Sequence, residues 1–496
     1  MKDKFLLISN IIAKYSFAIF IVLFSISNIF FSVRQMNALT DDANYLFIDF
    51  IDIVFILLLC ILFVFIYKKN FFNISSEKMM FSFLLSGLII GLYWIFTNPQ
   101  ELKELDDAYN CYTTAYNMSN GDYSWLGFKS YINVYPHNLG LVTYFFIICK
   151  IFGGLSLYVI RIINLLFSLA GYFYLYKITV LLFKDERINK IEILLMYLSM
   201  QLIFISFFVY GNSISYSLAI ISVFYLLKYF EDRKCKYLII SGITVVIAIA
   251  IKNNSLIILV AELIYIFLDF IKRINYKYII YVIVLALTIF VSTAGVIKYY
   301  EKTVGVTYDN KLPTICWLAY GVNYEPKHPG RYFNFLEQYH YANNFDAQYT
   351  EIEARDYIDR VFDSWKEHPE YAINFYFQKF LTSFANPEYE TFAQYRKSEL
   401  NVINNSIMGG KINDFIYRTW DATSTLISVG LLVYLFKHKQ DRIYELMPAV
   451  IVFGGFLFHI FWETKAIYLY QYFMYLLPYA AVGISIILGK VKKCNI

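Results

Sequence analysis

The sequence predicts an all-α polytopic membrane protein of about 12 transmembrane helices, with two larger extracytoplasmic loops that carry interfacial helices. The first observation is composition, because 59% of the residues are hydrophobic and only 16% are charged. Soluble domains are roughly 45–50% apolar and about 25% charged. The second observation is the recurrence of apolar stretches of roughly 17–20 residues, the length that crosses the hydrocarbon core. The third is the placement of the basic residues along the chain.

Apolar length sets the expected spans. The first is expected to be retained, because no small-residue cleavage site follows Val33. The twelve predicted spans are 15–33, 51–67, 79–96, 155–183, 191–210, 213–230, 237–251, 255–271, 278–297, 421–436, 443–461 and 471–489.

Basic residues predict the orientation of these spans. Seven segments hold three Lys or Arg residues each, 21 of the chain's 43, and all seven fall on one side if the twelve spans are right. Cytoplasmic loops are enriched in Lys and Arg, so we expect that side to be cytoplasmic. Both termini then lie inside, in a multi-pass protein of the cell (plasma) membrane. The seven segments are 1–14, 68–78, 184–190, 231–236, 272–277, 437–442 and 490–496.

The short apolar segment 139–152 tests this topology. If it crossed the bilayer, four later basic segments and the C-terminus would lie outside. The segment is shorter than a span requires, and Lys150 interrupts it. We therefore expect an interfacial helix on the outer leaflet, with a short tilted span as the alternative.

This topology divides the chain into three parts. Residues 1–300 form an N-terminal transmembrane module that includes a first outer loop at 97–154. Residues 298–420 form a large extracytoplasmic loop, and residues 421–496 contain the C-terminal transmembrane helices.

Two other outer segments are not assigned to the reaction. The aromatic-rich stretch around Lys379 predicts a surface helix, with that lysine reaching toward lipid headgroups. The loop at 34–50 is assigned nothing beyond solvated charge. The acids in and beside it are Asp41, Asp42, Asp49 and Asp52.

Two adjacent carboxylates, Asp106 and Asp107, open the first outer loop. Such a pair beside a membrane can bind a cation or accept a proton from a substrate hydroxyl. The alternative is a pair of solvated loop acids. The sequence contains no Gly-rich phosphate loop, and its six cysteines show no metal-binding spacing. Neither a soluble nucleotide-binding domain nor a zinc site is expected. The net charge of +5 follows membrane topology, so nucleic acid is not an expected partner.

Several short motifs occur in order between residues 100 and 485. They are GDYS, YPHNLG, IFGG, RIINLL, FVYGNSISYSLAIISVFYLL, the hairpin SGITVVIAIAIKNNSLIILVAELI with a lysine at its apex, CWLAYGVNYEPKHPGRYFN, FANPEYETF and FHIFWETKAIYLYQYFMYLLPYA. Their order and sidedness resemble the type C membrane glycosyltransferases. The chain looks closest to the glycosyltransferase family 39-like group, in the protein mannosyltransferase and aminoarabinose transferase superfamily, and to its bacterial Gram-positive-type branch.

The resemblance implies transfer of a sugar from a polyprenyl-phosphate-linked donor to an acceptor on the outer face. That acceptor would be a cell-surface glycan, a lipid or a protein. Asp107 falls on the catalytic acid of the family's first outer loop, with Asp106 beside it. Its implied role is general base on the acceptor hydroxyl. Both acids would be ligands of a divalent cation if a metal is used, and no other cofactor is implied.

The leaving group is already a phosphate, so it needs charge stabilisation more than protonation. The residues that the resemblance implies for substrate binding are Lys252, Lys465, Glu463, Arg331, His328, His137 and Tyr135. For the lysines the alternative is a headgroup contact, and for His137 it is a structural role. Aromatic residues that could stack on a sugar, or instead form an interfacial belt, are Tyr109, Tyr123, Trp125, Trp317 and Tyr320.

Two positions depart from the family pattern. Ile467 stands where an arginine usually follows the Glu463-Thr464-Lys465 segment, whereas Tyr468 keeps the family's tyrosine. Asn212 stands where other branches have a second acid. A phosphate or sugar contact is therefore missing or supplied from elsewhere.

Glu262 is the one carboxylate well inside a predicted span, and Arg161 or Lys177 is its expected partner. A proton-coupled transporter would also explain this acid. The alternative functions are thus a transporter or flippase, and a polymerase or ligase of lipid-linked cell-surface polysaccharide. Transporters often contain internal repeats, and the sequence shows none. A polymerase or ligase shares the lipid-linked substrate and stays open.

Overall fold

The computed structural model describes residues 2–35, 43–68, 73–98, 102, 107–275, 277–324, 328–392, 411–439 and 443–493. Most of these residues are helical, as expected where hydrocarbon forces each segment to satisfy its own backbone polar groups. Within this part of the chain, nine helices are long and apolar enough to cross a membrane, or up to ten if a bent pair is one span. The predicted all-α polytopic membrane protein is confirmed, whereas the number twelve is not.

The helices of the N-terminal half are α1 (Lys2–Phe30), α2 (Phe50–Lys68), α3 (Ser76–Thr97), α4 (Asp107–Ser119), α5 (Tyr131–Val134), α6 (Leu139–Phe152), α7 (Ser156–Phe183), α8 (Glu186–Leu198), α9 (Gln201–Ile205) and α10 (Asn212–Asp232). Those that follow are α11 (Cys235–Ile251), α12 (Leu256–Arg273), α13 (Lys277–Phe290), α14 (Val296–Val304), α15 (Ile315–Gly321), α16 (Phe335–Ala342), α17 (Ala347–Glu367), α18 (Pro369–Phe384), α20 (Lys411–Lys437), α21 (Met447–Phe461), α22 (Ala466–Met474) and α23 (Leu477–Lys493).

Two of the predicted spans are broken helices. The segment 191–210 is divided between α8 and α9, and the hydroxyl groups of Tyr172 and Tyr470 donate to the Ser199 carbonyl at the break. The segment 471–489 is divided between α22 and α23, which meet at 54°. Pro478 lies in the first turn of α23, where it cannot continue the hydrogen bonding of a preceding helix. Apolar length alone does not show where such breaks fall.

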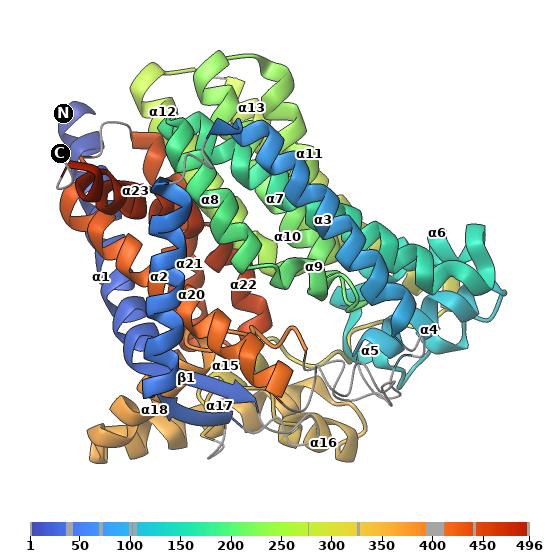
Figure 1. Ribbon diagram of the computed structural model, residues 1–496. Helices are drawn as coiled ribbons and strands as arrows, with labels where there is room; N and C mark the ends of the chain where they lie inside the picture. The colour runs from blue at the N-terminus through green and yellow to red at the C-terminus, as the bar shows by residue number, and fades with distance from the viewer. Residues whose placement is uncertain are drawn as a thin grey trace.

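The segment 139–152 forms a separate helix, α6, that is followed by a short turn before α7. It packs beside α4: Lys150 Nζ donates to the Ser119 carbonyl at 3.1 Å, and the rings of Tyr112 and Phe145 meet edge to face. Figure 1 shows α4 and α6 together at one side of the molecule, away from both termini. The interfacial position of α6 stays a prediction.

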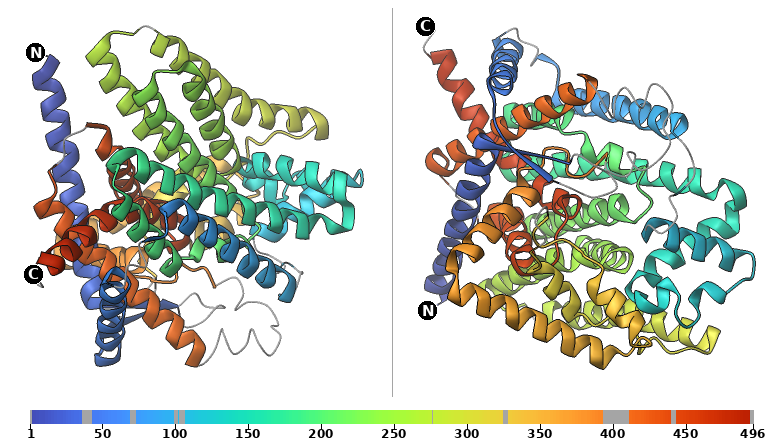
Figure 2. Two further views of the ribbon diagram at one scale, coloured as in Figure 1. Left: turned by 45° about the horizontal axis from the view of Figure 1, so that its top comes forward. Right: turned by 90° about the horizontal axis from the view of Figure 1, so that it is seen from below.

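The two ends of the molecule differ. Both termini and the connection between α12 and α13 lie at one end, whereas α15 to α18 lie at the other (Figure 1). Seen from below, α17 and α18 follow one edge of this second end (Figure 2, right). The elements of the large loop therefore gather at the end opposite the termini.

A small hairpin also lies at this second end. Strands β1 (Phe31–Gln35) and β2 (Ala43–Phe47) pair antiparallel, with Val33 opposite Tyr45. The hairpin is joined to the end of α18, because the Val33 amide donates to the Ala385 carbonyl at 2.8 Å. The segment after α1 is therefore tied to the large loop rather than free.

The assignment of solvated charge to the acids near residue 50 is wrong for Asp52, whereas Asp49 is exposed, as expected. Asp52 is 3% exposed and lies 2.6 Å from an Arg418 nitrogen, and Asp49 lies 2.9 Å from the same nitrogen. Arg34 of β1 pairs with Asp414 at 2.8 Å. Buried charges require such partners, and these come from α20, far away in the sequence. Asp41 and Asp42 lie outside the described residues.

Candidate functional site

Asp107 is the first residue of α4, so its carboxylate lies at the positive end of a helix dipole. The Tyr131 hydroxyl donates to Asp107 Oδ1 at 2.9 Å, and Asn138 Nδ2 donates to that hydroxyl oxygen at 3.0 Å. Tyr131 lies on α5, whose first turn is capped by the Ser130 side chain. This chain of contacts fixes one oxygen of the carboxylate. Asp106 lies outside the described residues.

Lys252 lies in the turn between α11 and α12. Its ammonium group is 3.8 Å from the ring centroid of Tyr210 and 5.1 Å from that of Tyr468. Burial lowers the pKa of Lys252 to about 8, whereas the Asp107 charge opposes this change and the Lys465 charge adds to it. Lys252 therefore packs on two tyrosine rings of the protein, which favours a role in the site over the alternative of a contact with lipid headgroups.

Glu463 and Lys465 belong to the segment 462–466, which connects α21 to α22 and ends at the first residue of α22. The Glu463 amide donates to the Trp317 carbonyl at 2.9 Å, and the Thr464 amide donates to the Gly330 carbonyl at 2.8 Å. Residues of the large loop therefore hold this segment through its backbone.

The side chain of Glu463 is 7% exposed. Burial raises the pKa of its carboxyl group, whereas the nearby charges of Lys465, Arg331 and Lys252 lower it and that of Asp107 raises it. The charges of Asp107 and Lys465 thus act on both Lys252 and Glu463, although the four residues come from three separate parts of the chain. The structure brings these four residues into one site.

Ile467, which stands where the family has an arginine, supplies no positive charge to the site. Its side chain is 4% exposed, and its carbonyl accepts a hydrogen bond from the Tyr216 hydroxyl at 2.9 Å. Asn212, the other departure from the family pattern, donates to the same hydroxyl at 2.7 Å. Both departures thus belong to one buried contact between α10 and α22.

Tyr135 and His137 form an aromatic group with Trp317 of α15. The ring centroids of Tyr135 and His137 are 6.1 Å apart, and Trp317 lies 6.2 Å from the first and 5.7 Å from the second. His137 is exposed, whereas Tyr135 is 8% exposed. Tyr320, by contrast, is fully buried in the same helix and cannot stack on a substrate.

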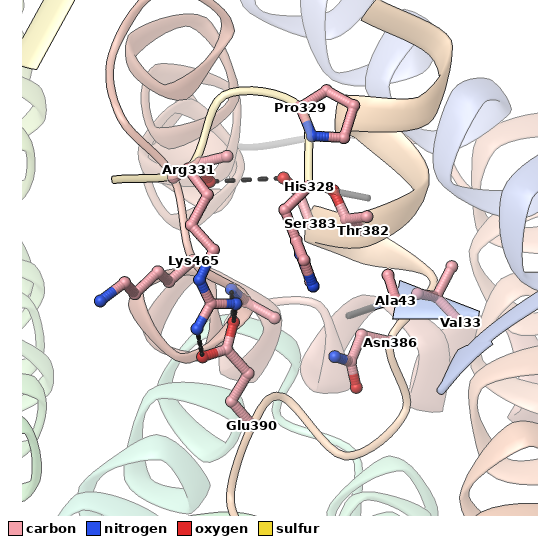
Figure 3. A pocket seen from close by; sticks show the side chains of 12 residues that line it. Val33, Ala43, His328, Pro329, Arg331, Thr382, Ser383, Asn386, Glu390 and Lys465 are labelled. Carbon is pink, nitrogen blue, oxygen red and sulfur yellow. Dashed lines mark hydrogen bonds and ion pairs between the residues drawn. The ribbon is translucent and has the colours of Figure 1, made fainter. Parts of the chain in front are cut away.

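Arg331 and His328 line a small pocket together with Lys465 (Figure 3). Arg331 nitrogens lie 3.2 and 3.4 Å from the two carboxylate oxygens of Glu390. Figure 3 shows the Lys465 ammonium directed away from this pair. The cavity measures about 10 Å³, room for one water molecule. The arginine is thus committed to a protein carboxylate, and the pocket itself is too small for a sugar.

Three residues that contact the predicted site residues or the 462–466 segment were not themselves predicted: Glu390, Tyr131 and Tyr210. Glu390 accepts from Arg331 and also from the Ala466 amide at 3.0 Å, so it holds the end of the 462–466 segment. Tyr131 and Tyr210 contact Asp107 and Lys252. Glu390 and Tyr210 fall within the motifs FANPEYETF and FVYG, but nothing in those letters shows the direction of a side chain.

Two further predictions are wrong. Lys379 does not reach toward headgroups, because it is 3% exposed and donates to three backbone carbonyls. The expected partners of Glu262 are also wrong, since its carboxylate accepts from the Ser222 hydroxyl at 2.6 Å. Arg161 instead lies over the Phe207 ring and donates to the Phe207 carbonyl.

A metal site is not apparent among the residues that the structure describes. No group of three or more His, Cys, Asp or Glu side chains there could hold an ion. Asp106, the second predicted ligand, lies outside the described residues. The divalent cation therefore stays a hypothesis that depends on this acid.

One comparison with known proteins gives a match. Residues 141–295, from α6 to the π-helical turn after α13, match a family model described as dolichyl-phosphate-mannose-protein mannosyltransferase. This similarity supports a membrane glycosyltransferase of type C. The matched range includes Lys252 but neither Asp107 nor the 462–466 segment. No curated protein and no solved structure matches the chain significantly.

Proposed function

We propose that the protein transfers a sugar from a polyprenyl-phosphate-linked donor to an acceptor hydroxyl at the outer face of the cell membrane. The observation that carries the proposal is the position of Lys252, which packs on the Tyr210 and Tyr468 rings where the charges of Asp107 and Lys465 both act on it. A carboxylate beside two cations suits a reaction in which a hydroxyl loses a proton while a phosphate leaves.

Asp107 supplies the base. Oδ1 accepts the Tyr131 hydrogen bond, and among the described residues no donor reaches Oδ2. An acceptor hydroxyl bound at Oδ2 gives up its proton there as its oxygen bonds to the anomeric carbon. The bond between that carbon and the phosphate oxygen breaks, and the polyprenyl phosphate leaves.

Lys252 and Lys465 supply positive charge for the phosphate. Charge-assisted hydrogen bonds from ammonium groups are about twice as strong as neutral ones. The rings of Tyr210 and Tyr468 cover part of the Lys252 ammonium, and a partly desolvated cation attracts an anion more strongly than one in bulk water. The exposed His137 and its aromatic neighbours offer a surface for a sugar ring.

The proposal is tested with the full-length protein in proteoliposomes. A panel of polyprenyl-phosphate sugars is supplied with an extract of cell-surface acceptors, and the free polyprenyl phosphate left by transfer is measured. We expect one donor to give this product with the wild-type protein and not with the Asp107→Asn variant. The proposal fails if no donor is cleaved, or if the variant cleaves it equally well. Movement of an intact donor across the bilayer without cleavage would identify a transporter.

A further inference from the structure

Lys379 is a buried cation outside the residues assigned to the reaction. It lies on α18, is 3% exposed, and its Nζ donates to the carbonyls of Gly321 at 2.6 Å, Ile460 at 2.8 Å and Trp462 at 2.9 Å. An ammonium group has three donors, and here all three are used. These bonds join α18 to the end of α15 and to the end of α21.

The segment 462–466 begins at one of these carbonyls. Its backbone amides find partners only outside the segment, at Trp317, Gly330 and Glu390 for residues 463, 464 and 466. Residues 462–465 have no regular secondary structure, so their path depends on what surrounds them. Lys379 is the surrounding residue that fixes the carbonyl where the segment starts.

Gly330 couples this lysine to the middle of the segment. A Cβ atom at residue 330 would lie only 2.4 Å from Lys379 Cε, so the glycine backbone packs directly on the lysine stem. The Gly330 carbonyl accepts from the Thr464 amide. The backbone φ of +78° also favours glycine at this position. The lysine therefore supports the segment at residue 462 directly and at residue 464 through Gly330.

We propose that Lys379 is a positioning residue for donor binding, which fixes the 462–466 segment so that Glu463 and Lys465 face Lys252 and Asp107. The inference rests on the proposed function, since it assigns Lys465 to the donor phosphate. Burial lowers the pKa of Lys379 to about 7, and the Glu463 charge opposes this change.

Two variants test the proposal in the proteoliposome assay. Lys379→Met keeps the apolar stem but removes the three donors, and Gly330→Ala keeps the lysine but displaces it. Both are expected to raise the donor KM about tenfold or more, because Lys465 is then no longer held in place for its charge-assisted contact with the donor phosphate. The acceptor KM is expected to stay within about twofold. Lys366→Met, at an exposed residue of α17 paired with Asp363, is the matched control and should leave both constants unchanged.

A double variant separates positioning from general stability. If Lys379 acts through Lys465, then Lys379→Met combined with Lys465→Met is no worse in donor KM than Lys465→Met alone. Additive losses, equal rises in both KM values, or an unchanged donor KM in both single variants would overturn the proposal. If Lys379→Met does not accumulate, Gly330→Ala decides the same question. Failure of the proposed function itself is distinct, because then the wild-type protein and Asp107→Asn leave equal amounts of polyprenyl phosphate.

Discussion

Asp107 and Lys252 have different roles in the proposed reaction, the first as the base and the second as positive charge for the phosphate. One lies at the start of α4 and is held by Tyr131, and the other lies in the turn before α12 and packs on Tyr210. The Asp107 charge acts on Lys252, and the two side chains would pair directly if both were free to move. Hydrogen bonding and ring packing instead keep each side chain on its own support, so both remain available to a substrate.

We expect Asp107→Asn to abolish transfer almost completely while expression and donor binding stay normal. The amide keeps the size of the side chain and can still accept from Tyr131, but it cannot take a proton. Base catalysis contributes roughly 10²–10⁴-fold, so the residual rate should lie in that range below wild type. Turnover and donor binding are measured separately in proteoliposomes. Transfer above about a tenth of the wild-type rate would exclude an essential base at this position.

The pKa of Lys252, about 8, predicts a pH dependence of donor affinity. The donor is a phosphodiester and keeps its charge through neutral and alkaline pH. Lys252 is protonated below pH 8 and loses its charge as the pH rises through this value, so affinity should fall on the alkaline side. Donor KM is measured between about pH 6.5 and 9.5. Lys252→Arg keeps its charge over this range and should flatten the profile. The same alkaline loss in this variant would show that another group titrates.

At the scale of elements, the features that could be predicted from the sequence are those that depend on short stretches of it. Apolar length predicted most of the long helices, and motif order gathered Asp107, Lys252, Glu463 and Lys465 as candidates that the structure brings together. The bend after α22 and the β1–β2 hairpin were missed, because both depend on contacts with distant segments. Lys379 was misplaced for the same reason, because the local pattern of a surface helix does not show which of its side chains face α15 and α21.

The Arg331–Glu390 pair predicts where the large loop is most sensitive. Both side chains are largely buried, so removal of one charge leaves the other poorly compensated. We expect Glu390→Gln to lower the free energy of unfolding by about 3 kcal/mol. Glu351→Gln breaks the exposed pair with Arg355 and should change it by less than about 0.5 kcal/mol. Thermal unfolding in detergent compares the two variants, and equal stability would show that Arg331 does not depend on this carboxylate.

At the scale of the whole molecule, the site and the large loop lie on the same side of the fold. The 462–466 segment takes its hydrogen bonds from α15, the turn at Gly330 and residue 390, all within the loop. Both termini and the α12–α13 connection lie at the opposite end (Figure 1). The basic segments predict that the end with the termini is cytoplasmic. A lipid-linked donor would then meet its acceptor outside the cell.

Cysteine labelling tests this orientation. In a background without the native cysteines, single cysteines are placed at Asn120 and Ser364, two exposed residues near the large-loop end, and at Asn275 near the termini. We expect an impermeant thiol reagent to label the first two in intact cells and the third only after the membrane is opened. Native Cys235, the first residue of α11, is exposed, and restored alone it serves as a second cytoplasmic probe. Because three basic residues surround each cytoplasmic probe, inversion would require these charges to lie outside. Labelling of Asn275→Cys and Cys235 in intact cells, with the other two protected, would reverse the orientation and place Asp107 in the cytoplasm.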